Sequence, residues 1–296
     1  IFCGLFFINR TMKILHTADW HLGKKIDRFS RIEEQSLVME EIVQIADQHK
    51  VDAVIIAGDL FDNFTPNIEA IELFYKTLKK LSLGGVRPVI AIAGNHDAPK
   101  LIDAPDPLAR ECGIILIGYP NAIVKNTDSS YFRISFSKEG FFEITFSQYN
   151  YPLRIIHTPY ANESRMREEL KGDKQDCINQ ILSEKWSALA EEFCDTKGVN
   201  ILTTHLFMNP RGGEVLEEPE GERPIKIGNA DMIYTDIIPP QIQYTALGHL
   251  HGFKNIGSKE KPIVYASSPL CYSFSEAGQQ KYVVIIEAEP NREIKL

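Results

Sequence analysis

The first third of the chain alternates short apolar runs with amphipathic segments. Three runs have the length and β-branched content of buried strands: residues 13–17, 52–57 and 88–93. Between them, residues 33–50 carry apolar side chains at roughly helical spacing, and Thr65-Pro66 predicts the N-cap and first position of a helix that continues to about Leu83. This order of strands and helices predicts a parallel sheet flanked by helices.

The rest of the chain predicts a second run of strands. Residues 131–137 and 141–148 alternate apolar and polar positions across a Lys-Glu-Gly turn, which indicates a β-hairpin. A long amphipathic helix is expected at 176–193, and a polar surface loop at 209–231. One strand is expected at 114–117, before the hairpin, and the strands after the hairpin are expected at 153–157, 199–204, 244–247, 262–266 and 282–287. We therefore predict an α/β fold in which two sheets pack face to face with helices outside, giving four layers in the order αββα.

Composition narrows the class of protein. The 296 residues carry a formal net charge of −8, so binding to a polyphosphate requires a local source of positive charge, such as metal ions or a partner subunit. Five cysteines without a CxxC pair indicate reduced thiols in a cytoplasmic protein. No apolar run approaches the roughly 18 residues of a membrane span. Residues 1–11 lack the features of a signal peptide, and we interpret them as an upstream extension or artefact.

Polar side chains follow five of the predicted strands at the points where these strands end. In chain order they are Asp19 and His21, Asp59 and Asp62, Asn95 and His96, His205, and His249 and His251. Ligands of open α/β sheets bind outside the carboxyl ends of the strands. We therefore expect these side chains to converge on one site for two divalent metal ions, built around Asp59.

The residue types suggest a division of roles within this site. Asp59 has two carboxylate oxygens and is expected to bridge the ions, while Asn95 offers an amide oxygen. His249 and His251 are two residues apart in an extended segment and are expected to project the same way. The mixed donor set favours Mn²⁺, or Fe²⁺/Zn²⁺, over Mg²⁺.

His96 is expected to act on the substrate rather than on a metal ion. Its imidazole can donate to a phosphate oxygen or protonate the leaving oxygen. The carboxylate of Asp62 is expected to accept from the other ring nitrogen of His96 and to fix the tautomer. The expected nucleophile is a hydroxide bridging the two ions.

The ordered set of motifs resembles the calcineurin-like metallophosphoesterase superfamily. The motifs are D-x-H at 19–21, G-D-x-x-D at 58–62, G-N-H-D at 94–97, His205, and G-H-x-H at 248–251. Within the superfamily, five segments resemble the SbcD-type nuclease subunits of bacterial SbcCD DNA-repair complexes. These segments are HTADWHLGKK (16–25), GDLFD (58–62), ERPIKIG (222–228), ALGHLH (246–251) and SSPLCYSFSE (267–276).

The resemblance covers residues 12–288, which it identifies as the phosphoesterase domain, and 289–296 as the start of a cap region that the family continues into. It implies a dimetal site whose ligands are Asp19, His21, Asp59, Asn95, His205, His249 and His251, with His96 as the catalytic histidine. It also implies Mn²⁺-dependent endonuclease and 3′→5′ double-strand exonuclease activity on DNA ends and hairpins. The implied partner is an SbcC-type ATPase, the implied assembly is a homodimer, and the implied roles are DNA repair, recombination and replication.

Two other functions remain open. One is a phosphoesterase for phosphoproteins or small nucleotides, although protein phosphatases of the superfamily carry Arg and Glu where this chain has Asn63 and Asp97. The other is a non-catalytic subunit of a repair complex, against which the full donor set argues. Several nearby residues also have two interpretations. His16 is more typical of a packed strand residue than of a ligand, and His157 is more typical of a core or rim residue than of one that lines the cleft. Trp20 either packs or stacks on a base, and Lys24, Lys25, Arg28 and Arg31 either form a solvated face or contact phosphate.

Overall fold

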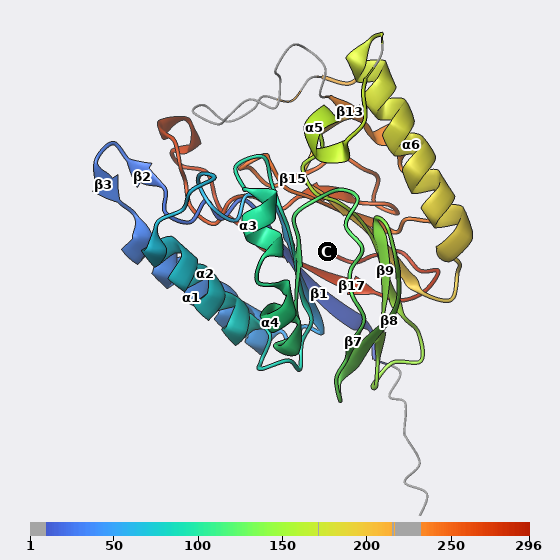
Figure 1. Ribbon diagram of the computed structural model, residues 1–296, viewed down its shortest axis with the longest axis horizontal. Helices are drawn as coiled ribbons and strands as arrows, with labels where there is room; N and C mark the ends of the chain where they lie inside the picture. The colour runs from blue at the N-terminus through green and yellow to red at the C-terminus, as the bar shows by residue number, and fades with distance from the viewer. Residues whose placement is uncertain (1–9, 171, 215, 217–231) are drawn as a thin grey trace, which may run out of the picture.

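Two β-sheets lie face to face at the centre of the molecule, with helices on the outer side of each (Figure 1). The computed structural model describes residues 10–170, 172–214, 216 and 232–296. Figure 1 shows α1 and α2 along one side of the pair of sheets and α6 along the other. The predicted αββα order of layers is confirmed.

The first sheet has five strands in the order β17-β1-β4-β5-β6. The strands β1 (Met12–Thr17), β4 (Ala53–Ala57), β5 (Val89–Ile92) and β6 (Ile114–Ile117) are parallel. Every residue of β4 and β5 is buried, as expected for strands covered on both faces. The predicted parallel arrangement is confirmed.

The helices of this half pack on the outer face of the first sheet. They are α1 (Ile32–Gln48), α2 (Ile68–Leu81), and the short α3 (Pro99–Asp103) and α4 (Asp106–Glu111). The predicted start of α2 at Thr65-Pro66 is wrong. The N-cap is Asn67, whose side-chain oxygen accepts from the backbone N–H of Ala70 at 2.8 Å and satisfies a donor in the first turn.

The second sheet has eight strands in the order β15-β16-β14-β11-β10-β9-β8-β7. Its central strands β10 (Leu153–Thr158), β11 (Val199–Thr204), β14 (Tyr244–Leu247) and β16 (Ile263–Tyr265) are parallel. The predicted hairpin is confirmed as β8 (Phe132–Lys138) and β9 (Phe141–Phe146), and the edge strands are β7 (Thr127–Asp128) and β15 (Lys254–Asn255). The helix α6 (Lys174–Phe193) covers the outer face, preceded by the short α5 (Glu163–Met166).

The last strand belongs to the first sheet, although we expected it to complete the second run. β17 (Val284–Ala288) pairs antiparallel with β1, with Met12 opposite Ala288. Its Ile286 is buried in the core between the sheets, while Ile285 packs towards the helices of the first half. The apolar pattern of a strand fixes its two faces, but it does not specify which open sheet edge the strand joins.

Three apolar layers hold the sandwich together. The layer between the sheets contains Phe142 and Tyr244, the layer under α1 and α2 contains Trp20 and Phe74, and the layer under α6 contains Trp186. The inner layer joins the two sheets directly, so the loops at their carboxyl ends lie along one edge.

The remaining elements are short. They are β2 (Lys25–Ile26), β3 (Phe29–Ser30), β12 (Met208–Asn209), β13 (Ile233–Tyr234) and the 3₁₀ turns η1 (Thr235–Ile237) and η2 (Phe274–Glu276). Most of the loop expected at 209–231, including the segment 222–228, lies outside the described residues. Within the described part of the chain, no helix is long and apolar enough to span a membrane.

Candidate metal centre

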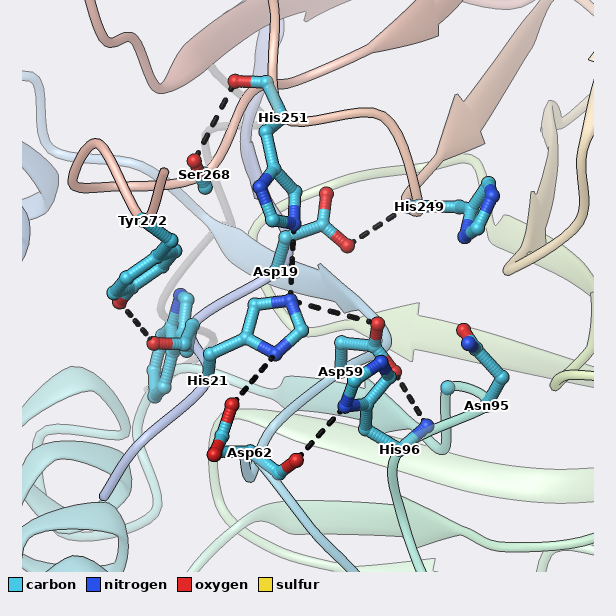
Figure 2. A network of polar contacts seen from close by, with 12 residues as sticks. Asp19, His21, Asp59, Asp62, Asn95, His96, His249, His251, Ser268 and Tyr272 are labelled. Atoms are coloured by element: carbon cyan, nitrogen blue, oxygen red, sulfur yellow. Dashed lines mark hydrogen bonds and ion pairs between the residues drawn. The ribbon is translucent and has the colours of Figure 1, made fainter. Parts of the chain in front are cut away.

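The polar residues predicted at the strand ends converge at one edge of the sandwich (Figure 2). The loops after β1, β4 and β5 of the first sheet meet the loops after β11 and β14 of the second. The seven predicted metal ligands and His96 are all buried, and Asp62 is partly buried. Such a concentration of buried carboxylates and imidazoles costs free energy unless positive charge and hydrogen bonds compensate it.

The backbone of these loops adopts conformations that ordinary residues seldom take. Asp19, His21, Asp59 and His249 have φ angles of 54°, 43°, 49° and 100°. The first loop is tied to the second because Asp19 N–H donates to Gly58 O at 3.0 Å and His21 N–H donates to Asp59 O at 2.9 Å. Positive φ at non-glycine residues is typical of sites where function, rather than stability, sets the geometry.

Glycines at two of these strand ends permit the close approach of the donors. A Cβ atom added to Gly58, which has φ +94°, would lie 2.2 Å from His205 Nδ1. One added to Gly94 would lie 2.0 Å from Asp59 Oδ1. The glycines of the G-D and G-N motifs are therefore required by packing against the donor groups.

Asp59 lies at the centre of the cluster. Its Oδ2 is 3.3 Å from His205 Nε2 and 3.6 Å from His21 Nε2, while its Oδ1 accepts from the His96 backbone N–H at 2.9 Å. Asp59 belongs to both groups of side chains that could hold an ion, one with His21 and His96 and one with Asp19 and His205. One oxygen placed between two imidazoles is the geometry of a shared ligand.

His21 and His251 stand on one side of Asp59, and Asp19 lies between this pair and His205, whose Nδ1 is 3.8 Å from Asp19 Oδ1. The Nε2 atoms of His21 and His251 face each other at 3.1 Å (Figure 2). Asp19 Oδ1 accepts from the His249 backbone N–H at 2.8 Å, whereas its buried Oδ2 has no hydrogen-bond partner among the described residues. Facing imidazole nitrogens and a buried carboxylate oxygen form a donor set that fits a divalent cation.

On the other side stand Asn95, His205 and His249. His205 Nδ1 lies 2.8 Å from the carbonyl oxygen of Ala57, and its Nε2 lies 2.9 Å from Asn95 Oδ1. The ring of His249 packs edge-on against that of His205, with 5.7 Å between centroids. If the backbone carbonyl accepts from Nδ1–H of His205, the lone pair of Nε2 is left for a metal ion.

His249 and His251 do not project the same way, contrary to our expectation. The ring of His251 reaches His21 (Figure 2), whereas that of His249 lies against the ring of His205. The alternation of side chains requires an extended backbone, and the φ of 100° at His249 interrupts it. Each histidine of the G-H-x-H motif therefore lies in a different half of the centre.

The ionisable groups of the cluster strongly shift one another's pKa values. Burial, together with the charge of Asp59, raises the pKa of Asp19 to about 7 despite the opposing effect of His205 and His251. Burial would also raise the pKa of Asp59, but the neighbouring His205, His96 and His21 hold it well below its usual value. Burial would lower the pKa of His205, but Asp59 and Asp19 raise it to about 9. The carboxylates thus stabilise positive charge in the centre, and divalent cations would supply that charge.

His96 is oriented by a different atom of Asp62 from the one we predicted. Its Nδ1 lies 2.8 Å from the backbone carbonyl oxygen of Asp62, not from the carboxylate. The carboxylate instead pairs with Lys24 Nζ at 3.2 Å and lies 3.9 Å from His21 Nδ1. The carbonyl can fix the tautomer of His96 as well as a carboxylate could, because either oxygen accepts the Nδ1 proton.

Two residues outside the predicted set brace the loop that carries Asn95 and His96. The carboxylate of Asp97 accepts from Gly94 N–H at 2.7 Å within its own turn, and it also accepts from the N–H groups of Leu60 and Phe61. The buried guanidinium of Arg165 donates to Gly94 O at 2.8 Å and to Asp97 O at 2.7 Å. Arg165 is distant in sequence and carries no motif, so no sequence signal identified it.

A second bracing network surrounds the loop that carries His21. Gln35 Nε2 donates to His21 O at 2.7 Å and contacts Tyr272 Oη at 3.3 Å, and Tyr272 Oη donates to Trp20 O. Tyr272 belongs to the segment 267–276, whose sequence resemblance was the one available signal for this role.

Three of the residues with two interpretations, His16, Trp20 and His157, are buried. His16 is buried, with Nδ1 2.9 Å from Tyr244 Oη, and Trp20 is buried with its indole N–H donating to Thr17 Oγ1 at 3.0 Å. His157 is also buried, and this burial lowers its pKa to about 3. The interpretation of these three residues as packed side chains is confirmed. Lys24 pairs with Asp62, and Arg31 donates to Cys271 O.

Comparison with known proteins agrees with the family resemblance and the fold described above. A sequence profile described as calcineurin-like phosphoesterase matches residues 12–252. The SbcD subunit of the nuclease SbcCD from Bacillus subtilis (strain 168) is 36% identical over 287 residues, which are 95% of this chain and 68% of that protein. Among solved structures, GAP50, the anchor in the inner membrane complex of Plasmodium, has a TM-score of 0.50 at 12% identity, covering 96% of this chain and 82% of that one. This last likeness concerns the fold alone.

Proposed function

Because the chain belongs to the calcineurin-like phosphoesterase family, we propose that it is a DNA nuclease of the SbcD type that hydrolyses phosphodiester bonds. The observation that carries the proposal is the 36% identity with a nuclease subunit over 95% of the chain. The geometry supports it, because the donors expected of a two-metal phosphoesterase lie together in one buried cluster.

We assign each proposed ligand to one of two metal ions, according to the half of the cluster in which it lies. Asp19, His21 and His251 would hold one ion, Asn95, His205 and His249 the other, and Asp59 would be shared. The Oδ2 of Asp19, which lacks a hydrogen-bond partner in the described part of the chain, and the facing Nε2 atoms of His21 and His251 fit this assignment. The donors favour Mn²⁺, with Mg²⁺ or Fe²⁺/Zn²⁺ as alternatives. When bound, the ions would lower the pKa of water and offset the negative charge of the phosphate.

His96 is the residue that we assign to the substrate. With Nδ1–H donating to the Asp62 carbonyl, the imidazolium form of His96 can donate its Nε2 proton to a phosphate oxygen or to the leaving oxygen. Asp62 keeps the ring in place through its backbone, and its carboxylate holds Lys24 beside the centre. Asp97 and Arg165 fix the backbone on which His96 stands.

The specific nuclease activities that we propose rest on the resemblance to SbcD-type nucleases. We propose Mn²⁺-dependent 3′→5′ double-strand exonuclease and single-strand endonuclease activity in cytoplasmic DNA repair, recombination and replication, carried out by the domain at residues 12–288. An SbcC-type ATPase and a second copy of this chain are the proposed partners. The net charge of −8 agrees with this, because the metal ions and a partner would have to supply the positive charge that DNA requires.

A nuclease assay tests the proposal directly. Purified protein is incubated with linear and hairpin-ended DNA in the presence of Mn²⁺, Mg²⁺ or EDTA, and with a small phosphomonoester in parallel. We expect Mn²⁺-dependent cutting that EDTA abolishes. Phosphate release from the monoester without DNA cutting would instead support the nucleotide or phosphoprotein alternative, and inactivity on both with bound Mn²⁺ would support a non-catalytic subunit.

The variant His96→Ala tests the role of that side chain. It removes the proposed donor but none of the proposed metal ligands. We expect the turnover rate on DNA to fall by about 10²–10⁴-fold, while Mn²⁺ binding measured by calorimetry stays close to that of the wild type. Unchanged cutting by His96→Ala would refute the assignment of His96.

A further inference from the structure

An ion pair between a buried glutamate and a partly buried lysine lies beside the metal centre, and the function proposed above uses neither residue. Glu276, at the end of η2, is 2% exposed, and its Oε2 lies 2.5 Å from Lys281 Nζ. Its Oε1 accepts from Tyr272 N–H at 3.1 Å and from Ser273 Oγ at 3.0 Å. The same Oε1 lies 3.2 Å from Nδ1 of His251, one of the proposed ligands.

Lys281 secures the same histidine a second time. Besides Glu276, its ammonium donates to the backbone carbonyl of His251 at 2.8 Å and to Ser268 Oγ at 3.1 Å. Ser268 N–H also donates to the carbonyl of His251, at 3.2 Å. The contact between Ser268 and His251 is visible in Figure 2. The segment 267–281 therefore holds both the main chain and the ring of His251.

We propose that Glu276 is a positioning residue that prepares His251 to bind a metal ion, and that Lys281 holds Glu276 in place. A carboxylate has no proton to donate at neutral pH, so it accepts from Nδ1–H of His251. The imidazole is then fixed in the tautomer that carries its lone pair on Nε2, the atom that faces His21. This inference rests on the metal centre of the proposed function.

Comparison with two other imidazoles of the centre, those of His205 and His96, supports this role. His205 and His96 have Nδ1 2.8 Å from the backbone carbonyls of Ala57 and Asp62, so in all three rings Nδ1 lies beside an oxygen acceptor. Among these three, His251 has a charged acceptor, and burying that charge is costly unless it is paired. The donors Lys281, Tyr272 and Ser273 provide the pairing.

The test compares wild type with Glu276→Gln and Glu276→Ala. Gln preserves the volume and one acceptor oxygen but places its amide near Lys281 or Tyr272, whereas Ala removes the acceptor. Glu143→Gln is the matched control, because this partly buried carboxylate also pairs with a cation, Arg154 at 2.8 Å, on the second sheet. Mn²⁺ binding is measured by calorimetry, and the tautomer of His251 is measured by ¹⁵N NMR of the metal-free protein.

We expect Mn²⁺ affinity to fall by about 10–100-fold in Glu276→Ala, less in Glu276→Gln, and not in Glu143→Gln. In the metal-free wild type, His251 should carry its proton on Nδ1, and this preference should be lost in Glu276→Ala. Should Glu276→Ala fail to fold, the same two measurements on Glu276→Gln decide the question, with a smaller shift in each.

The outcomes separate this inference from the proposed function. A wild type that binds no divalent ion would overturn the metal centre, while the NMR measurement would still decide whether Glu276 sets the tautomer. A wild type that binds Mn²⁺ and Glu276 variants with wild-type affinity and tautomer would overturn the positioning role alone.

Discussion

The substitution Gly58→Ala tests the packing on which the metal centre depends. The added Cβ would lie 2.2 Å from Nδ1, 2.5 Å from Cγ and 2.8 Å from Cβ of His205. The imidazole would have to retreat by about 1.3–1.8 Å to reach ordinary van der Waals contact at about 3.5–4.0 Å. It is held by Ala57 O at 2.8 Å and Asn95 Oδ1 at 2.9 Å, so the retreat would break contacts that orient the ring.

Two costs add in this variant. Alanine at φ +94° carries a left-handed backbone strain of about 1–2 kcal/mol. Overpacking against His205 adds about 1–3 kcal/mol. Gly84→Ala is the matched control, because Gly84 also has positive φ, +67°, but an added Cβ would meet no atom within 4 Å. The control therefore carries the backbone strain alone, and the difference between the variants isolates the steric cost.

Urea unfolding of the metal-free variants measures the free energies of unfolding, and calorimetry measures Mn²⁺ binding. We expect Gly58→Ala to be less stable than Gly84→Ala by about 1–3 kcal/mol, which still permits folding for a domain of ordinary stability. We also expect Mn²⁺ affinity to fall in Gly58→Ala and to be unchanged in Gly84→Ala. Equal stability of the two variants, with wild-type Mn²⁺ affinity in both, would refute the packing argument.

Two further predictions concern a shared ligand and a buried histidine. Asp59→Asn removes the charge placed between His21 and His205, so calorimetry should no longer detect two bound Mn²⁺ ions; two ions held with wild-type affinity would contradict the shared role. His157→Leu should reduce the acid sensitivity of the fold. The folded-state pKa of His157 is lowered from 6.5 to about 3, so its contribution to stability is present above about pH 6.5 and is lost as the pH falls towards 3. The free energy of unfolding, measured with urea between pH 6 and 4, should change with pH less steeply in His157→Leu than in wild type, by about 1.4 kcal/mol per pH unit. Identical slopes for the two proteins would count against this account.

The sequence predicted most of the elements because strands and helices differ in the period of their apolar positions. The continuous apolar runs of β4 and β5 and the alternation in β8 and β9 were sufficient to identify these strands. The start of α2 was less predictable, because Thr65 and Asn67 are both capping residue types, and only the bond from Ala70 N–H selects Asn67.

The candidate site was predictable to the level of residues but not of atoms. Each proposed donor follows a strand, and the strand ends share one edge, so the sequence order alone brings Asp19, Asp59 and Asn95 together. Their roles as ligands stay a prediction. The sequence could not indicate that Asp62 uses its carbonyl, since every residue offers one. It also gave no sign of Arg165, which reaches Gly94 from a short helix far along the chain.

The sequence by itself determined which residues are apolar on which face, and therefore the strands, the helices and the polar side chains at the strand ends. Tertiary structure decided which edge β17 joins, how His249 and His251 divide between the two halves of the centre, and which carboxylate supports His251. The physical reason is that periodicity is a local property of the chain. Strand pairing, positive φ angles and buried hydrogen bonds depend instead on groups that folding brings together from distant positions.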